Sequence, residues 1–99
     1  MEKWQSEIEG IPDEVVSLIP GYLHRRAREV DDLKQYLSVS NYSAMKQIGH
    51  KLKGNGNAYG FRSISHLGHQ IEIAAADEDD QKLKGLVDDL EKELARLTS

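Results

Sequence analysis

The chain has 99 residues, enough for one small domain with one hydrophobic core and too few for a catalytic kinase domain beside it. It contains no cysteine, which excludes a disulfide framework and a thiolate metal site, and its formal net charge of -4 argues against nucleic-acid binding. We find no basic leader followed by an apolar run and no membrane-length apolar stretch. We therefore expect a soluble, cytoplasmic protein without membrane insertion, forming one domain over residues 1–99.

The N-terminal fifth of the chain has weak hydrophobic periodicity. We expect residues 1–10 to be partly ordered, because only Trp4 and Ile8 offer large apolar side chains. Residues 13–19 are predicted to form a short helix. Pro20 either kinks this helix or begins the next one, because proline lacks an amide donor but is favoured in a first turn.

Two longer helices are predicted next. The first runs to about Ser38, with an apolar face formed by Leu23, Ala27, Val30, Leu33 and Leu37. Asn41 is expected to cap the second, which should end near Asn57, where glycines and asparagines crowd together. At about 100° per residue, this second helix has one stripe facing the core and another facing water. The core stripe is Met45, Ile48, Gly49, Leu52 and Gly56, and the water stripe is Lys46, His50, Lys53 and Asn57.

The remaining helices follow a short loop at residues 58–60. The first is predicted to end near Ala75 or Ala76, and its apolar positions are Phe61, Ile64, Leu67, Gly68 and Ile71. We expect Gly68 to let a neighbouring helix approach closely and Asp77 to cap the last helix. In that helix, apolar residues repeat at spacings of three and four: Leu83, Leu86, Val87, Leu90, Leu94 and Leu97. Since no run alternates with period two, we predict an all-α, antiparallel four-helix bundle with a short additional N-terminal helix.

One combination of residues indicates chemistry. His50, Lys53 and Gly54 lie close together on one predicted helix. Because residues three apart are neighbours on a helix surface, Lys53 can reach a group attached to His50. An exposed imidazole is mostly an uncharged nucleophile at neutral pH and can carry a phosphoryl group, whose charge Lys53 would partly neutralise. Gly54 leaves room for the phosphoryl oxygens or for a partner's backbone.

This pattern resembles the histidine-containing phosphotransfer (HPt) domains of two-component phosphorelays. Their hallmark is His-x-x-Lys-Gly, a stretch of small residues, then glycine and an apolar residue, which His50, Lys53, Gly54, Gly60 and Phe61 match in register. The resemblance covers nearly the whole chain, through Leu18 to Leu23, Arg26, Glu29, Val30, Leu67, Ile71 and Glu72. Two features depart from it: Gly49 replaces a common alanine, and Asn55-Gly56-Asn57 replaces a Ser/Ala run. We expect them to affect helix stability more than chemistry.

The resemblance implies a phosphoryl carrier without autonomous kinase activity. His50 would take a phosphoryl group from a phospho-aspartate on one response-regulator receiver domain and pass it to an aspartate on another. The implied partners are receiver domains and a hybrid sensor kinase. No cofactor is intrinsic to the chain, and Mg²⁺ is expected on the receiver partner. Lys53 would stabilise phosphate charge and Gly54 would give steric clearance, while the residues expected to bind the partner are Lys46, Lys51, Asn57, Arg62, His69 and Glu72. We expect a monomer.

The charges are unevenly distributed along the sequence. Basic residues surround His50 in sequence, whereas acidic residues concentrate in the C-terminal quarter. Each charge can be explained as solvated helix surface. Because receiver domains carry an acidic pocket, the basic group would also speed the encounter and orient the partner.

Several alternatives remain for the polar residues. Glu72 would lie beside His50 and accept a hydrogen bond from its imidazole if the bundle pairs as in HPt domains; a polar groove between two helices explains it equally well. His66, His69 and Glu72 lie three apart, but three such positions spread over roughly 120° of a helix, so we predict no metal site. Residues 54–60 lack the ending of a phosphate-cradling loop. The alternative function is a non-phosphorylated helical adaptor that binds a receiver or kinase domain.

Overall fold

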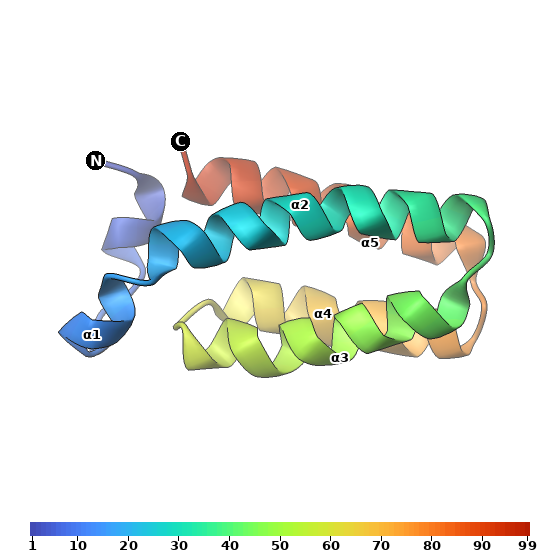
Figure 1. The fold of residues 1–99 in the computed structure, drawn as a ribbon, viewed down its shortest axis with the longest axis horizontal. Coiled ribbons are helices and arrows are strands. Elements are labelled where there is room, and N and C mark those ends of the chain that lie inside the picture. The colour runs from blue at the N-terminus through green and yellow to red at the C-terminus, as the bar shows by residue number, and fades with distance from the viewer.

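The computed structural model describes all 99 residues and contains only helices. The elements are the 3-10 helix η1 (Lys3–Ser6) and the α-helices α1 (Asp13–Val16), α2 (Ile19–Ser38), α3 (Tyr42–Ala58), α4 (Arg62–Ala76) and α5 (Asp80–Leu97). Four long helices run back and forth along a body of 39 × 22 × 17 Å, α2 beside α5 and α3 beside α4 (Figure 1). This confirms the predicted all-α bundle with a short N-terminal addition. No helix combines the length and the apolar character needed to cross a membrane.

Most helices begin and end where the capping and turn residues of the sequence predict. Pro20 lies in the first turn of α2, so it begins that helix and does not kink the one before it. The Asn41 side chain accepts a hydrogen bond from the Ala44 amide at 3.2 Å, which confirms it as the cap of α3.

The predicted cap of the last helix was wrong. Asp79, not Asp77, caps α5, and its side chain accepts from the Lys82 amide at 3.1 Å. Asp77 instead ends α4, because Glu78 adopts a left-handed conformation (φ 53°) and the Asp79 amide turns back to the Ala74 carbonyl at 3.0 Å. A left-handed residue just after the last turn is a common way for a helix to end.

The core is built from one face of each long helix. All six predicted apolar positions of α5 are buried, which confirms its amphipathic pattern. On α2 the prediction needs one correction, because Ala27 is exposed: its methyl group is too short to span the gap to α5, and it lines a surface groove instead. Tyr22 is fully buried on that helix, stacks on Tyr59 with 4.1 Å between ring centroids, and donates a hydrogen bond to Asn55 Oδ1 at 2.6 Å.

The N-terminal segment packs against the far end of the chain, and both termini lie at the same end of the bundle (Figure 1). Trp4 is buried in the core cluster, and the Lys3 amide donates to the Ser99 carbonyl at 3.2 Å. Arg96 on α5 forms ion pairs with Glu7 at 2.6 Å and with Glu93 at 2.7 Å. The segment therefore closes one end of the bundle.

Helices α3 and α4 pack more extensively against each other than any other pair of elements. A Cβ atom added at Gly68 would lie 2.5 Å from the Leu52 side chain and 2.7 Å from the Lys53 amide nitrogen, so the expected close approach at Gly68 is confirmed. Gly56 likewise lies against the Ser65 backbone. Gly56 therefore serves the packing of α3 on α4, and α3 continues unbroken to Ala58.

Candidate functional site

His50 lies in the middle of α3 on the predicted water-facing stripe. The core stripe of the same helix is turned inward, with Met45, Gly49, Leu52 and Gly56 buried and Ile48 half-buried. This amphipathic division places the imidazole outward, and 71% of its side chain is exposed. Few side chains therefore restrict the approach of a second molecule to the ring.

Glu72 of α4 holds one edge of that ring. Its Oε2 atom lies 2.9 Å from His50 Nδ1, so the first of the two alternatives left open for Glu72, a contact with the imidazole, is present. The carboxylate is only 21% exposed, and it is presented to α3 from the neighbouring helix. An ionised carboxylate can only accept hydrogen bonds, so this contact favours the tautomer with the ring proton on Nδ1.

His69 lies one turn earlier on α4, on the other side of the same carboxylate. Its Nδ1 atom is 3.9 Å from Glu72 Oε1, which is too long for a hydrogen bond, and this buried atom has no partner. His66, the other histidine of α4, is exposed. No group of three or more His, Cys, Asp or Glu side chains is arranged to hold a metal ion.

A polar pocket of about 440 Å³ opens beside His50. It is lined by Ser43, Lys46, Gln47, His50, Lys51 and Glu72, without a hydrophobic residue. Three of the residues predicted to bind a partner, Lys46, Lys51 and Glu72, are thus brought together. Ser43 and Gln47 were not predicted; their spacing of seven and three residues before His50 places them on its stripe and could have identified them.

The other predicted residues lie outside this pocket. Lys53, Gly54 and Asn57 are exposed further along α3, and Arg62 is exposed at the start of α4. A Cβ atom added at Gly54 would have nothing within 4 Å. The surface beyond His50 is therefore open at Gly54 and flanked by a cation at Lys53.

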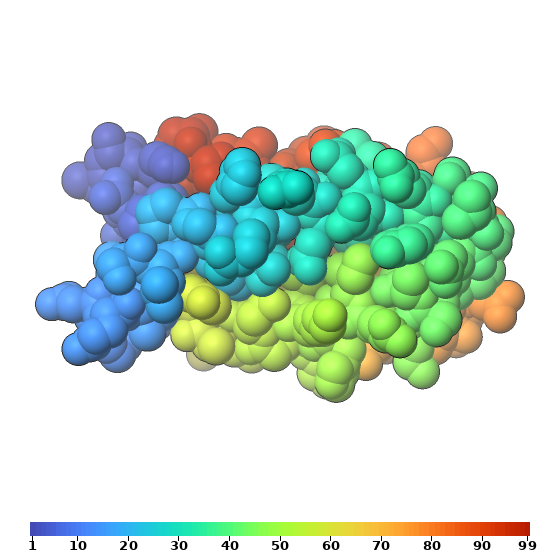
Figure 2. Space-filling view, viewed as in Figure 1, coloured from blue at the N-terminus to red at the C-terminus, as the bar shows by residue number.

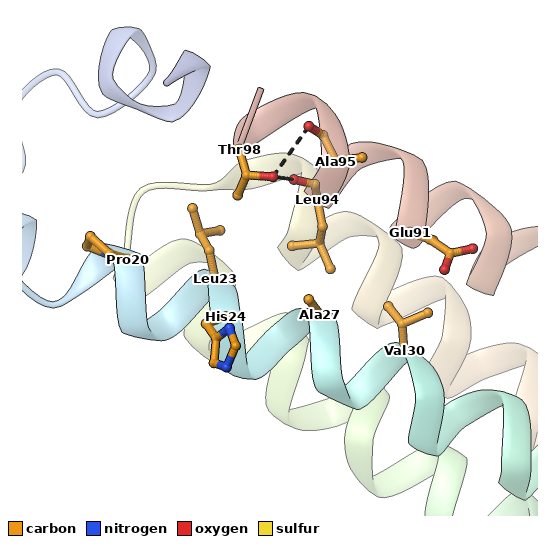
Figure 3. A pocket seen from close by; sticks show the side chains of 9 residues that line it. All are labelled: Pro20, Leu23, His24, Ala27, Val30, Glu91, Leu94, Ala95 and Thr98. Carbon is orange, nitrogen blue, oxygen red and sulfur yellow. Dashed lines mark hydrogen bonds between the residues drawn. The ribbon is translucent and has the colours of Figure 1, made fainter. Parts of the chain in front are cut away.

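The largest cavity of the protein, about 480 Å³, is elsewhere. It lies between α2 and α5, with Leu23, Leu94 and Val30 pointing into it and His24 and Glu91 among its lining residues (Figure 3). None of its lining residues belongs to α3 or α4. It is thus separate from the pocket beside His50.

The arrangement at His50 suits one chemical task. With Nδ1 bound to Glu72, the lone pair of the ring is on Nε2, the nitrogen away from the carboxylate, in a ring that is mostly in solvent. A nucleophile with this orientation can attack an electrophile carried by a docking partner. The remaining polar side chains of the pocket offer charge and hydrogen bonds but no second nucleophile paired with a base.

Comparison with known families gives one match. The Hpt domain family matches residues 21–99, which include the whole of α3, α4 and α5 and most of α2. No curated protein and no solved structure matches the chain. The matched range leaves out only η1, α1 and the first residues of α2.

Proposed function

Because the chain belongs to the Hpt domain family, whose members are phosphoryl carriers of phosphorelays, we propose that it shuttles a phosphoryl group through His50. The group would come from a phospho-aspartate on one receiver domain and pass to an aspartate on another. Hpt domains interact in general with receiver domains and sensor kinases and are not enzymes in the usual sense.

The observation that carries the proposal is the combination of exposure and orientation at His50. The ring is 71% exposed, and its Nδ1 is 2.9 Å from the Glu72 carboxylate. Exposure lets the active site of another protein close over the ring. Because the ring is oriented with its proton on Nδ1, toward Glu72, Nε2 need not lose a proton before it attacks.

The transfer step follows from this tautomer. Nε2 of His50 attacks the phosphorus of the phospho-aspartate, and an N–P bond forms as the bond from phosphorus to the aspartate oxygen breaks. The electron pair of the broken bond leaves with the aspartate carboxylate. The ring, still protonated at Nδ1, acquires a positive charge, which the Glu72 carboxylate stabilises. Return of the group to another aspartate reverses these changes.

The neighbours of His50 have supporting roles in this proposal. Lys53, one turn along α3, would neutralise part of the phosphoryl charge, and Gly54 would leave room for the partner. Lys46 and Lys51 would face acidic groups of the receiver, which supplies Mg²⁺. Since the partner contributes most of the transition-state stabilisation, the carrier needs few catalytic groups of its own.

The test is phosphoryl labelling of the purified protein by receiver domains charged with acetyl phosphate. We expect an acid-labile label on the wild-type protein and its return to a receiver. His50→Gln should abolish the label and leave helicity unchanged, while His66→Gln, which alters an exposed histidine of α4, should be labelled normally.

Two outcomes would contradict the proposal. Efficient labelling of folded His50→Gln would remove His50 from the mechanism. If folded wild-type protein took no label from any functional receiver of the same organism, a non-phosphorylated adaptor that binds a receiver or kinase domain would become the better explanation.

A further inference from the structure

The residue before His50 lies at the point where α3 and α4 touch. A Cβ atom added at Gly49 would lie 2.7 Å from the Glu72 amide nitrogen, 2.7 Å from the Gly68 carbonyl oxygen and 3.1 Å from the Glu72 Cα. All three are backbone atoms of α4, which cannot rotate away as a side chain can. At Gly49, therefore, only a hydrogen atom fits between the two helices.

The contact is reciprocal. A Cβ atom at Gly68 would lie 2.8 Å from the Gly49 carbonyl oxygen and 2.7 Å from the Lys53 amide nitrogen. Each helix thus presents a glycine to the backbone of the other at the same crossing. The backbone of Glu72 is held against α3 immediately beside the residue that bears the imidazole.

We propose that Gly49 is a positioning residue for the phospho-acceptor: it lets the α4 backbone approach closely enough for Glu72 to hold Nδ1 of His50. This inference rests on the proposed function and names the residue that sets its geometry. The exposed ring has no hydrogen bond other than the one to Glu72. Its tautomer therefore depends on where α4 places that carboxylate.

The size of the effect follows from the distances. To reach an ordinary contact of 3.4 Å, a Cβ at Gly49 must push the α4 backbone outward by roughly 0.7 Å from its present 2.7 Å. If the same movement acted along the 2.9 Å contact between Nδ1 and Oε2, it would lengthen that contact to roughly 3.6 Å, beyond hydrogen-bond range. A hydrogen bond to a charged group is worth enough to change a tautomer ratio by about tenfold.

Gly56 provides a control that separates positioning from packing. A Cβ there would lie 2.4 Å from the Ser65 amide nitrogen and 2.8 Å from its Cα, so Gly56→Ala forces the same two helices apart. Gly56 is seven residues beyond Gly49, about 10 Å along α3, and does not contact Glu72. Gly85 on α5 has nothing within 4 Å, so Gly85→Ala should stabilise its helix without disturbing α3 or α4.

The experiment is the ¹⁵N spectrum of the His50 ring, assigned by its loss in His50→Gln, at a pH where the ring is neutral. In wild-type protein we expect the Nδ1–H form to predominate. Gly49→Ala, made in the Gly85→Ala background to retain helicity, should lower the ratio of the Nδ1–H to the Nε2–H form by about tenfold. Gly56→Ala in the same background should lose stability but keep the wild-type ratio.

Three results would overturn the inference. These are an unchanged ratio in folded Gly49→Ala, an equal change in Gly56→Ala, and a wild-type ring mainly in the Nε2–H form. The last result does not require any variant to fold. Because the spectrum is recorded without a receiver domain, failure here is distinct from failure of phosphoryl labelling, which tests the proposed function.

Discussion

Gly54 differs from the other glycines of α3 because no atom of the protein approaches it. The added Cβ atoms at Gly49 and Gly56 would meet backbone of α4, whereas one at Gly54 would have nothing within 4 Å. A glycine in an exposed helix interior costs about 1 kcal/mol relative to alanine. Folding alone does not explain Gly54, and its position four residues after His50 places it where a docking partner would lie.

We predict that Gly54→Leu leaves the fold intact and weakens receiver binding. Leucine is a better helix former than glycine and meets no neighbour here, so thermal stability should be unchanged or higher. The added side chain should obstruct the partner and raise the Kd by about tenfold, equivalent to about 1.4 kcal/mol. Calorimetric titration with a receiver measures this effect. Gly85 is an exposed glycine on α5 with equally open space around it, so the control variant Gly85→Leu should bind the receiver normally. Equal affinities of the two variants would exclude Gly54 from the interface.

At the scale of elements, a buried hydrogen bond joins α2 to α3. The Tyr22 hydroxyl donates to Asn55 Oδ1 at 2.6 Å, and its ring stacks on Tyr59. Burial raises the pKa of Tyr22 to about 12, although the Arg26 guanidinium, 4.8 Å from the ring centroid, opposes the rise. Ionisation would place a charge in the core and remove the proton that Asn55 accepts.

This raised pKa predicts how stability depends on alkaline pH. The unfolded chain releases the Tyr22 proton near the ordinary tyrosine value of 10.0, and the folded protein only near 12. The stabilisation of the folded state by protonated Tyr22 is therefore complete below pH 10 and is lost as pH rises to about 12. This loss lowers the free energy of unfolding by about 2.7 kcal/mol at most. Urea unfolding between pH 9 and 12 should show a shallower decline for Tyr22→Phe than for wild type. Tyr36→Phe, on the same helix, should keep the wild-type slope, and parallel curves for Tyr22→Phe and wild type would contradict the prediction.

Much of the helical pattern could be predicted because the apolar positions of each helix repeat with the period of an α-helix. The stripe of α5 and the outward position of His50 follow from that repeat alone. The start of α5 could not be predicted from local chemistry, because Asp77 and Asp79 are equally good caps. Only the left-handed Glu78 between them decides which is used.

Contacts between helices set the other limit of prediction. Whether Ala27 is core or groove depends on the spacing between α2 and α5, which no local pattern encodes. In the same way, the sequence shows that Gly49 stands where HPt domains commonly have alanine. It does not show that the Glu72 backbone packs against Gly49. The candidate site was therefore predictable as a set of residues, whereas its geometry required the packing of α3 on α4.

At the scale of the whole molecule, charge is unevenly distributed along the chain. Lys46 and Lys51 line the pocket beside His50, while many acidic residues lie on α5 or just before it. One broad face consists of α2 and α3, with α4 and α5 visible mainly behind its edges (Figure 2). A partner with an acidic active site should therefore be attracted to the side of the protein that bears α3, despite the overall charge of -4.

This uneven distribution of charge predicts that the rate of association with a receiver domain depends on salt. It also predicts that the effect of a charge substitution depends on where in the protein it is made. Lys51→Glu and Lys92→Glu each replace one positive charge by one negative charge, so both take the formal net charge from -4 to -6. Lys51 lines the pocket beside His50, whereas Lys92 is exposed on α5. We expect Lys51→Glu to slow association with a receiver by about tenfold at low salt, and Lys92→Glu to slow it much less, because steering depends on local potential more than on net charge.

Stopped-flow association rates at several salt concentrations measure the effect. The difference between the variants should shrink as salt rises, because the screening length falls to about 3 Å at 1 M. Equal slowing by both variants would mean that net charge alone governs the encounter. A difference that persists at high salt would mean that Lys51 makes a direct contact whose loss also accelerates dissociation, and the measured dissociation rates would then differ between the two variants.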